Sequence, residues 1–302
     1  MARLLVLTQF DRHQHWEMAY QAVLYKIEIG ESGSLTIDLG YIRFIPAEGV
    51  LALVNIARLW HRHSGEATVL QQVQQPVLQY LERMDAFVHD EAWLVAADTL
   101  PTHECWERSA ESTRLLELQP IASAEADNAR DVIRAVTRAR SILLTWLSND
   151  DLHVGRLCTM LSELASNIVH SDDQGFAIIQ RYTDTALPIP GSTITIAIAD
   201  LGIGIEASLR SRGMDGRTGT LRTGSDYILH SLQLGVSSRH TIAGNGLYQI
   251  KQQILEASGI LIIRSQRSMV IIEGGTHRVQ DDLVFVPGTQ VSLAIRSVVK
   301  EN

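Results

Sequence analysis

Residues 193–204 read TITIAIADLGIG, and this stretch decides the fold expected for the second half of the chain. Thr193–Ala199 is a run of β-branched residues and alanines, which predicts a buried strand. Asp200 follows the strand directly, and Gly202 and Gly204 come next. A carboxylate at this point can accept a hydrogen bond from the amino group of adenine, and glycines let the backbone approach a flat ring. The same residues also fit an ordinary Asp-x-Gly exit from a strand.

A second group of polar residues lies on a helix expected at His153–His170. Its sequence from residue 163 reads ELASNIVH, so Glu163, Asn167 and His170 stand four and three positions apart. These spacings place the three side chains near one face of a helix. A carboxylate, an amide and an imidazole grouped in this way suit ligand binding. A helix that turns its polar side to water has the same pattern.

Two glycine motifs follow in the last third of the chain. Residues 244–247 read GNGL and open a helix expected to end near Ser258. Free backbone amides at a helix N-terminus bind phosphate groups, although a plain turn before a helix has the same sequence. Residues 288–289 read GT and precede a strand expected at Gln290–Ile295. A strand is also expected at Leu283–Val286.

The order of these four motifs resembles the GHKL family of ATP-binding domains, to which histidine kinases and anti-sigma-factor serine kinases belong. The resemblance covers roughly residues 125–302 and implies a two-layer α+β fold of the Bergerat type that binds ATP and Mg²⁺. It implies that Glu163 is a catalytic general base, that Asn167 holds Mg²⁺ against the phosphates, and that Asp200 binds adenine. The other nucleotide-binding residues that it implies are His170, Gly202, Gly204, Gly244, Gly246, Leu247 and Thr289.

The segment before GNGL resembles the lid of the same family. Residues 235–240 read GVSSRH, and the resemblance makes Ser237, Ser238 and Arg239 further phosphate contacts. We expect a lid over residues 205–243 that closes when nucleotide binds.

The chain departs from the histidine kinases in one respect. A long amphipathic helix is expected at Ala124–Leu147, and it contains no histidine that could accept a phosphoryl group. The resemblance is therefore nearest to the anti-sigma-factor serine kinases. The same helix could support a homodimer.

The first part of the chain predicts a small α/β unit in which strands alternate with helices. Residues 44–49 read FIPAEG and link a strand expected at Ser34–Leu39 to a helix. This pattern resembles the STAS domain of anti-sigma-factor antagonists. In that family the residue at the place of Glu48 is a serine that the partner kinase phosphorylates. Glu48 is either a constantly charged mimic of that phosphorylated residue or a first-turn residue that the helix dipole favours.

These patterns divide the chain into three parts. We expect a STAS-like α/β domain at residues 1–98, a linker at residues 99–123 and the ATP-binding domain at residues 124–302. The length of 302 residues suits two domains.

Composition limits the classes of partner. A formal net charge of −8 argues against a general nucleic-acid binder, which needs a basic surface. We find no secretory signal and no apolar stretch of about 20 residues, so we expect a cytoplasmic protein that does not contact membranes. The two cysteines stand outside any C-x-x-C motif, which predicts neither a zinc site nor a disulfide. The histidine pairs at 13/15 and 61/63 fit solvated surface positions better than a metal site.

We therefore expect an ATP-binding regulatory protein that acts as a serine/threonine kinase on a separate regulatory protein of the STAS or sigma-factor type. A slow ATPase, or an ATP-gated binding module that transfers no phosphate to protein, is the main alternative. A binding scaffold with an inactive nucleotide site is a third.

Overall fold

The chain divides into two compact units, Met1–Ser112 and Thr113–Asn302, in the computed structural model. The structure describes residues 3–88, 93–98, 115–147, 150–184, 191–211, 213, 221–236 and 245–298.

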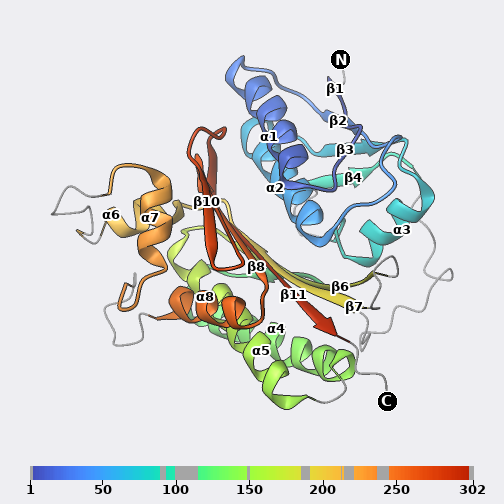
Figure 1. Ribbon diagram of the computed structural model, residues 1–302. Helices are drawn as coiled ribbons and strands as arrows, with labels where there is room; N and C mark the ends of the chain where they lie inside the picture. The colour runs from blue at the N-terminus through green and yellow to red at the C-terminus, as the bar shows by residue number, and fades with distance from the viewer. Residues whose placement is uncertain are drawn as a thin grey trace. The chain divides into compact units, whose positions relative to one another are not determined.

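The first unit contains a four-stranded parallel sheet whose strands follow one another in chain order. Figure 1 shows the first two helices side by side, and they contact each other. The sequence predicts alternating strands and helices here, and the structure shows a mixed α/β unit whose sheet is parallel. The strands are β1 (Arg3–Val6), β2 (Leu35–Asp38), β3 (Thr68–Gln71) and β4 (Leu94–Ala96), and the helices are α1 (His13–Glu28), α2 (Ala47–Ser64) and α3 (Gln75–Arg83).

Glu48 lies in the first turn of α2, where the sequence predicts it. Its side chain is partly buried, and this burial raises the pKa of the Glu48 carboxyl above its ordinary value. The shift favours the neutral acid. It therefore works against the constant negative charge that a mimic of a phosphorylated residue requires.

The second unit is built on a seven-stranded antiparallel sheet with the strand order β10-β9-β8-β11-β7-β6-β5. The antiparallel sheet predicted for this half of the chain is confirmed. Its strands are β5 (Leu116–Ile121), β6 (Gly175–Asp184), β7 (Gly191–Ala199), β8 (Ile260–Gln266), β9 (Ser268–Glu273), β10 (Thr276–Gln280) and β11 (Val286–Val298).

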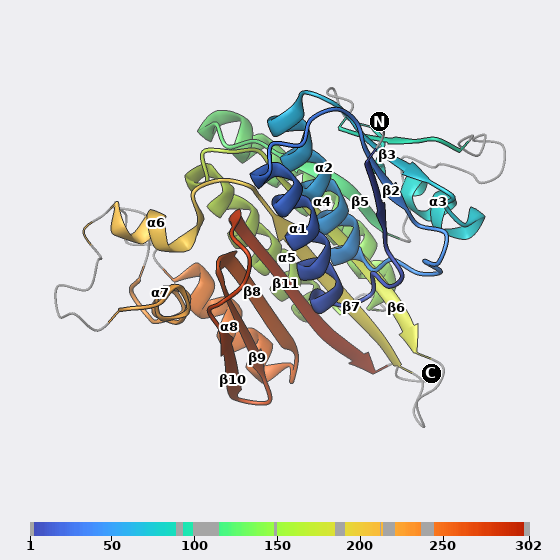
Figure 2. The same ribbon diagram turned by 90° about the horizontal axis from the view of Figure 1, so that it is seen from above.

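Three helices cover one face of this sheet: α4 (Glu125–Trp146), α5 (Asp151–Ser166) and α8 (Gly246–Glu256). Figures 1 and 2 show them as one layer beside the sheet layer. A continuous apolar core joins the two layers, and its fully buried members include Leu143, Leu161, Ile196 and Ile254. The burial of such side chains, each giving about 1.5–3 kcal/mol, fixes the helices against the strands.

The predicted linker at residues 99–123 is partly wrong, because it contains β5. This strand pairs with β6 and forms one edge of the seven-stranded sheet. The second unit therefore begins before residue 116 and not at residue 124. A proline at position 120 hides the strand in the sequence, and an edge strand is the place where a sheet tolerates proline.

The strand predicted at Leu283–Val286 is also wrong, because β11 begins only at Val286. The backbone before it is held by other groups. The carbonyl of Val284 accepts a hydrogen bond from the guanidinium of buried Arg264 at 2.8 Å, and the N–H of Leu283 donates to the carbonyl of Arg267 at 3.0 Å. These bonds take the place of a ladder with a neighbouring strand.

The segment predicted as a lid contains two helices, α6 (Gly204–Arg210) and α7 (Gly224–Ser231). The first turn of α7 is fixed by Asp281, which precedes the last strand. Its carboxylate accepts hydrogen bonds from the N–H and the hydroxyl of Ser225 at 2.9 and 2.7 Å, and from the hydroxyl of Ser268 at 2.7 Å. Part of the predicted lid is thus attached to the sheet.

The pKa of Asp281 follows from the same contacts. Burial acts to raise it, but the hydrogen bonds from Ser268 and Ser225 outweigh burial and hold the pKa below the ordinary value for aspartate. The charged form therefore stabilises the fold. This contribution is present above the pKa of the unfolded chain, about 3.9, and is lost as the pH falls through the lower folded-state value.

Replacement of Asp281 by Asn should lower the free energy of unfolding by about 1–2 kcal/mol at neutral pH, because three donors lose a charged acceptor. Hydrogen exchange should also become faster in α7. Denaturant unfolding at pH 7 and pH 3, with exchange measured by mass spectrometry, checks both effects. The difference from wild type should shrink at pH 3. The exposed neighbour Asp282, changed to Asn, is the matched control and should behave as wild type.

Candidate functional site

A cleft in the second unit collects most of the residues that the sequence singles out. Its empty volume is about 990 Å³, including the part that opens to solvent. Its walls come from α5, the short 3-10 helix η2 (Asn167–His170), the end of β7 and the residues after it, α6, the end of α7, the start of α8 and β11. The predicted residues that line it are Glu163, Asn167, His170, Asp200, Gly204, Gly246, Leu247 and Thr289.

Glu163 reaches the N-terminus of α8. A Cβ atom added to Gly246, the first residue of that helix, would lie 2.3 Å from Oε2 of Glu163. Glycine at position 246 is therefore what lets the carboxylate come so close. The N-terminus of a helix carries a partial positive charge, which favours an anion there. The cleft thus has one end that combines a carboxylate with helix N–H groups.

Asn167 and His170 lie just beyond the end of α5. The sequence predicts one helix to His170, but the α-helix ends at Ser166 and continues as the 3-10 turn η2. This tightening keeps both side chains on the wall of the cleft with Glu163. An amide oxygen and a carboxylate at one end of a cleft are the oxygen ligands that Mg²⁺ prefers.

Asp200 and Thr289 line the same cleft. Asp200 is 6% exposed, and its N–H donates to the carbonyl of Thr289 at 3.0 Å. Oδ1 of Asp200 accepts the N–H of Gly202 at 2.9 Å, which fixes the plane of the carboxylate.

Gly202 has a different role from the predicted one. It does not line the cleft, and a Cβ atom added to it would lie 1.6 Å from the carbonyl oxygen of Ser171. The room that glycine leaves is taken by this backbone and not by a ligand. The same carbonyl accepts the N–H of Ile203 at 2.9 Å, and a carboxylate oxygen of Asp173 accepts the N–H of Leu201 at 3.1 Å. The loop after η2 therefore holds the turn that carries Asp200.

Gly204 does line the cleft, and its φ of +78° is one that glycine adopts without strain. Four predicted phosphate contacts cannot be placed in the same way. They lie outside the residues that the structure describes: Ser237, Ser238, Arg239 and Gly244.

Sequence reasoning missed the wall that α6 and α7 contribute. Ser208 and Leu209 of α6 and Ser231 of α7 line the cleft, together with Val236. Both helices are short and lie between glycines, so no long apolar period marks them. The one available signal is Thr223 followed three residues later by Asp226. This pair forms a capping box at the start of α7.

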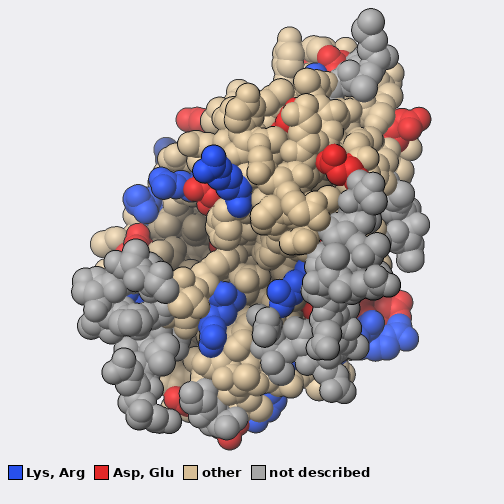
Figure 3. Space-filling view, turned by 90° about the vertical axis from the view of Figure 1, so that its right-hand side faces the viewer, with Lys and Arg blue, Asp and Glu red and all other residues tan. Residues whose placement is uncertain are grey.

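The charged groups on the surface are mixed in sign. Figure 3 shows Lys and Arg interspersed with Asp and Glu among other residues on one face of the molecule. Among the described residues, no helix is both long and apolar enough to cross a bilayer. Within the same part of the chain, no group of three or more His, Cys, Asp or Glu side chains could hold a metal ion.

Comparisons of the chain with protein-family models, with curated proteins and with solved structures found no match.

Proposed function

We propose that the cleft of the second unit binds ATP together with Mg²⁺, as the GHKL resemblance implies. The observation that supports this proposal is the convergence of four separate segments on one cleft. Glu163 and Asn167 come from one segment, Asp200 from the second, Gly246 from the third and Thr289 from the fourth. These are the residues to which the resemblance assigns base, metal, adenine and phosphate roles.

The residues that line the cleft suit two parts of ATP, the base and the phosphates. Buried Asp200 offers an acceptor to the adenine amino group, and the N-terminus of α8 offers N–H donors to phosphate. A phosphate at that helix end would lie beside the carboxylate of Glu163. Two anions in such proximity repel, and a divalent cation between them removes the repulsion. Asn167 and the phosphate oxygens would hold Mg²⁺, which supplies neutralisation of the phosphate charge.

We further propose that Glu163 serves as the base for transfer of the γ-phosphoryl group to a hydroxyl of a separate regulatory protein of the STAS or sigma-factor type. Water is the alternative acceptor, and the protein is then a slow ATPase or an ATP-gated switch. Glu48 favours this alternative, because it stands in the turn where the STAS resemblance expects a hydroxyl. Incubation with labelled ATP and candidate partners separates the two: label on a partner supports the kinase, and free phosphate alone supports the ATPase.

The proposed adenine contact makes a testable prediction about Asp200→Asn. In one orientation, the oxygen of the new side-chain amide accepts the N–H of Gly202, and its NH₂ group then faces the amino group of adenine. If it flips, its NH₂ group meets the N–H of Gly202 instead. In either orientation two hydrogen-bond donors face each other, so the Kd of Mg²⁺-ATP should rise by about 10–100-fold or more. Isothermal titration calorimetry of wild type and variant measures the change.

Inosine triphosphate provides the control, because its base has a carbonyl oxygen where adenine has an amino group. Asp200→Asn should bind it better than wild type does. Equal affinities of the variant and wild type for ATP would contradict the adenine contact. No heat of binding in wild type at millimolar Mg²⁺-ATP would leave the scaffold as the better explanation of the fold.

A further inference from the structure

The junction between α5 and η2 places Glu163 and Asn167, and a side chain of α4 bonds to its backbone. The last carbonyls of an α-helix need hydrogen-bond partners beyond the helix ladder. The carbonyl of Ala165, two residues before Asn167, accepts a hydrogen bond from Nδ2 of Asn128 at 3.2 Å. Asn128 belongs to the first turns of α4, which packs along α5 and also contacts η2.

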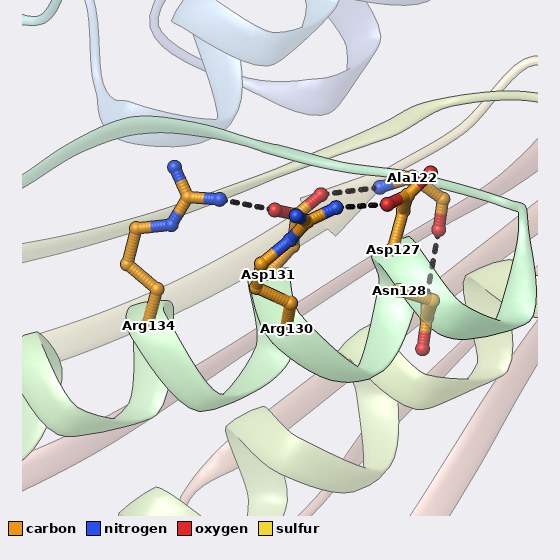
Figure 4. A network of polar contacts seen from close by, with 6 residues as sticks. All are labelled: Ala122, Asp127, Asn128, Arg130, Asp131 and Arg134. Atoms are coloured by element: carbon orange, nitrogen blue, oxygen red, sulfur yellow. Dashed lines mark hydrogen bonds and ion pairs between the residues drawn. The ribbon is translucent and has the colours of Figure 1, made fainter.

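Asn128 is a buried side chain that bridges two backbones. It is 5% exposed, and its Nδ2 also donates to the carbonyl of Ala122 at 2.8 Å, as Figure 4 shows. Both acceptors are carbonyl oxygens, so the amide nitrogen and not the amide oxygen must face them. The two N–H bonds of Asn128 are therefore both used, one on the connection after β5 and one on the end of α5.

The connection after β5 has a second, independent attachment. A carboxylate oxygen of Asp131, one turn further along α4, accepts the N–H of Ala122 at 3.0 Å. Figure 4 shows Asp131 and Asn128 bonded to opposite groups of the same residue, Ala122. Asp131 thus shares the loop contact of Asn128, but no bond of the described structure joins it to Ala165. Variants of Asp131 and Asn128 therefore distinguish the contact with the loop at Ala122 from the contact with the α5–η2 junction at Ala165.

We propose that Asn128 is a positioning residue for Asn167, and through it for the divalent cation of the proposed nucleotide site; this inference rests on the proposed function. Without the Asn128 amide, the carbonyl of Ala165 keeps only a backbone N–H beyond the helix as its donor, and the loss of the second, buried bond releases the junction from α4. Mg²⁺ demands near-ideal octahedral geometry, so a small shift of one protein ligand weakens its binding. Outer-shell partners of metal ligands affect metal affinity by about 10–100-fold.

The contact of Asn128 lies beside the proposed cation ligand Asn167 and not beside Asp200, the proposed adenine contact. The bonds of Asn128 reach the turn that carries Asp200 only through η2 and the loop after it, whereas Ala165 lies two residues from Asn167. Asn128→Ala should therefore spare the affinity for metal-free ATP. It should remove most of the gain in affinity that Mg²⁺ gives.

The experiment measures the Kd of ATP by calorimetry, with Mg²⁺ and with EDTA, in the full chain. Wild type, Asn128→Ala and Asp131→Ala are compared. We expect the gain from Mg²⁺ to fall about 10–100-fold in Asn128→Ala and to stay at the wild-type value in Asp131→Ala. The Kd in EDTA should be the same in all three proteins within about twofold. Asn128→Ser, whose hydroxyl can donate to one carbonyl only, is the second variant if the alanine variant does not fold.

Three outcomes would overturn the inference. In the first, Asn128→Ala keeps the full gain in ATP affinity that Mg²⁺ gives. In the second, its affinities for ATP with Mg²⁺ and in EDTA fall by the same factor, which indicates a general loss of structure. Wild type can also bind ATP without any gain from Mg²⁺. Failure of the proposed function looks different, because wild type then binds ATP in neither buffer.

Discussion

Glu163→Gln should lower the rate of phosphoryl transfer or ATP hydrolysis by about 10²–10⁴-fold and should not weaken the binding of Mg²⁺-ATP. Glutamine keeps the size of the side chain and can still accept a hydrogen bond, but it cannot take a proton from a hydroxyl or from water. Its neutral amide also repels phosphate less than the carboxylate does at the N-terminus of α8. Affinity should therefore stay the same or increase slightly while the rate falls.

Phosphate release and labelling of protein acceptors measure the rate, and calorimetry measures the affinity. Glu256→Gln is the matched control, since Glu256 lies at the other end of α8 in an ion pair with Arg156 at 3.4 Å. An exposed pair of this kind contributes about 0–1 kcal/mol, so this variant should keep the wild-type rate. An unchanged rate in Glu163→Gln would contradict the base role. A parallel loss of rate and affinity would mean that Glu163 only shapes the cleft.

The sequence predicts which motifs meet in the cleft, because each motif lies at the end of a helix or strand with a strong hydrophobic pattern. Thr193–Ala199 is apolar and β-branched, so the position of Asp200 at the strand end followed from the strand itself. The contacts that hold the site could not be predicted in this way. Asn128 bonds to a carbonyl 37 residues away, and Gly202 meets the backbone of Ser171. Such contacts depend on where two separate segments cross, which no local period records.

The missed strands have similar causes. The strand β10 (THRVQ) is exposed at every residue, so it has no hydrophobic alternation to mark it. The turn at Gly274-Gly275 between β9 and β10 is the sequence signal for this hairpin. The strand β6 begins with an apolar run but is recognisable only beside its partners β5 and β7. A strand that forms only because neighbouring strands pair with it is the hardest element to predict from one sequence.

Gly288→Ala should be the most destabilising of the substitutions considered, with a loss of more than about 3 kcal/mol in the free energy of unfolding. Two costs add at this position. The φ of Gly288 is +83°, and an L-residue in the left-handed region costs about 1–2 kcal/mol. The new Cβ would also lie 2.2 Å from the carbonyl oxygen of Asp200 and 2.7 Å from its Oδ1. Backbone must then move, and Asp200 moves with it.

Gly275 separates these two costs. Its φ is +80°, almost the same as that of Gly288, but a Cβ atom added there would meet nothing within 4 Å. Gly275→Ala should therefore lose only about 1–2 kcal/mol and should leave the Kd of ATP unchanged. Denaturant unfolding of both variants, followed by titration of ATP into the folded proteins, makes the comparison. Equal losses of stability would show that Gly288 is needed only for its φ. A larger loss in Gly288→Ala, together with weaker ATP binding, would show that Gly288 lets β11 approach Asp200, the residue proposed to bind adenine.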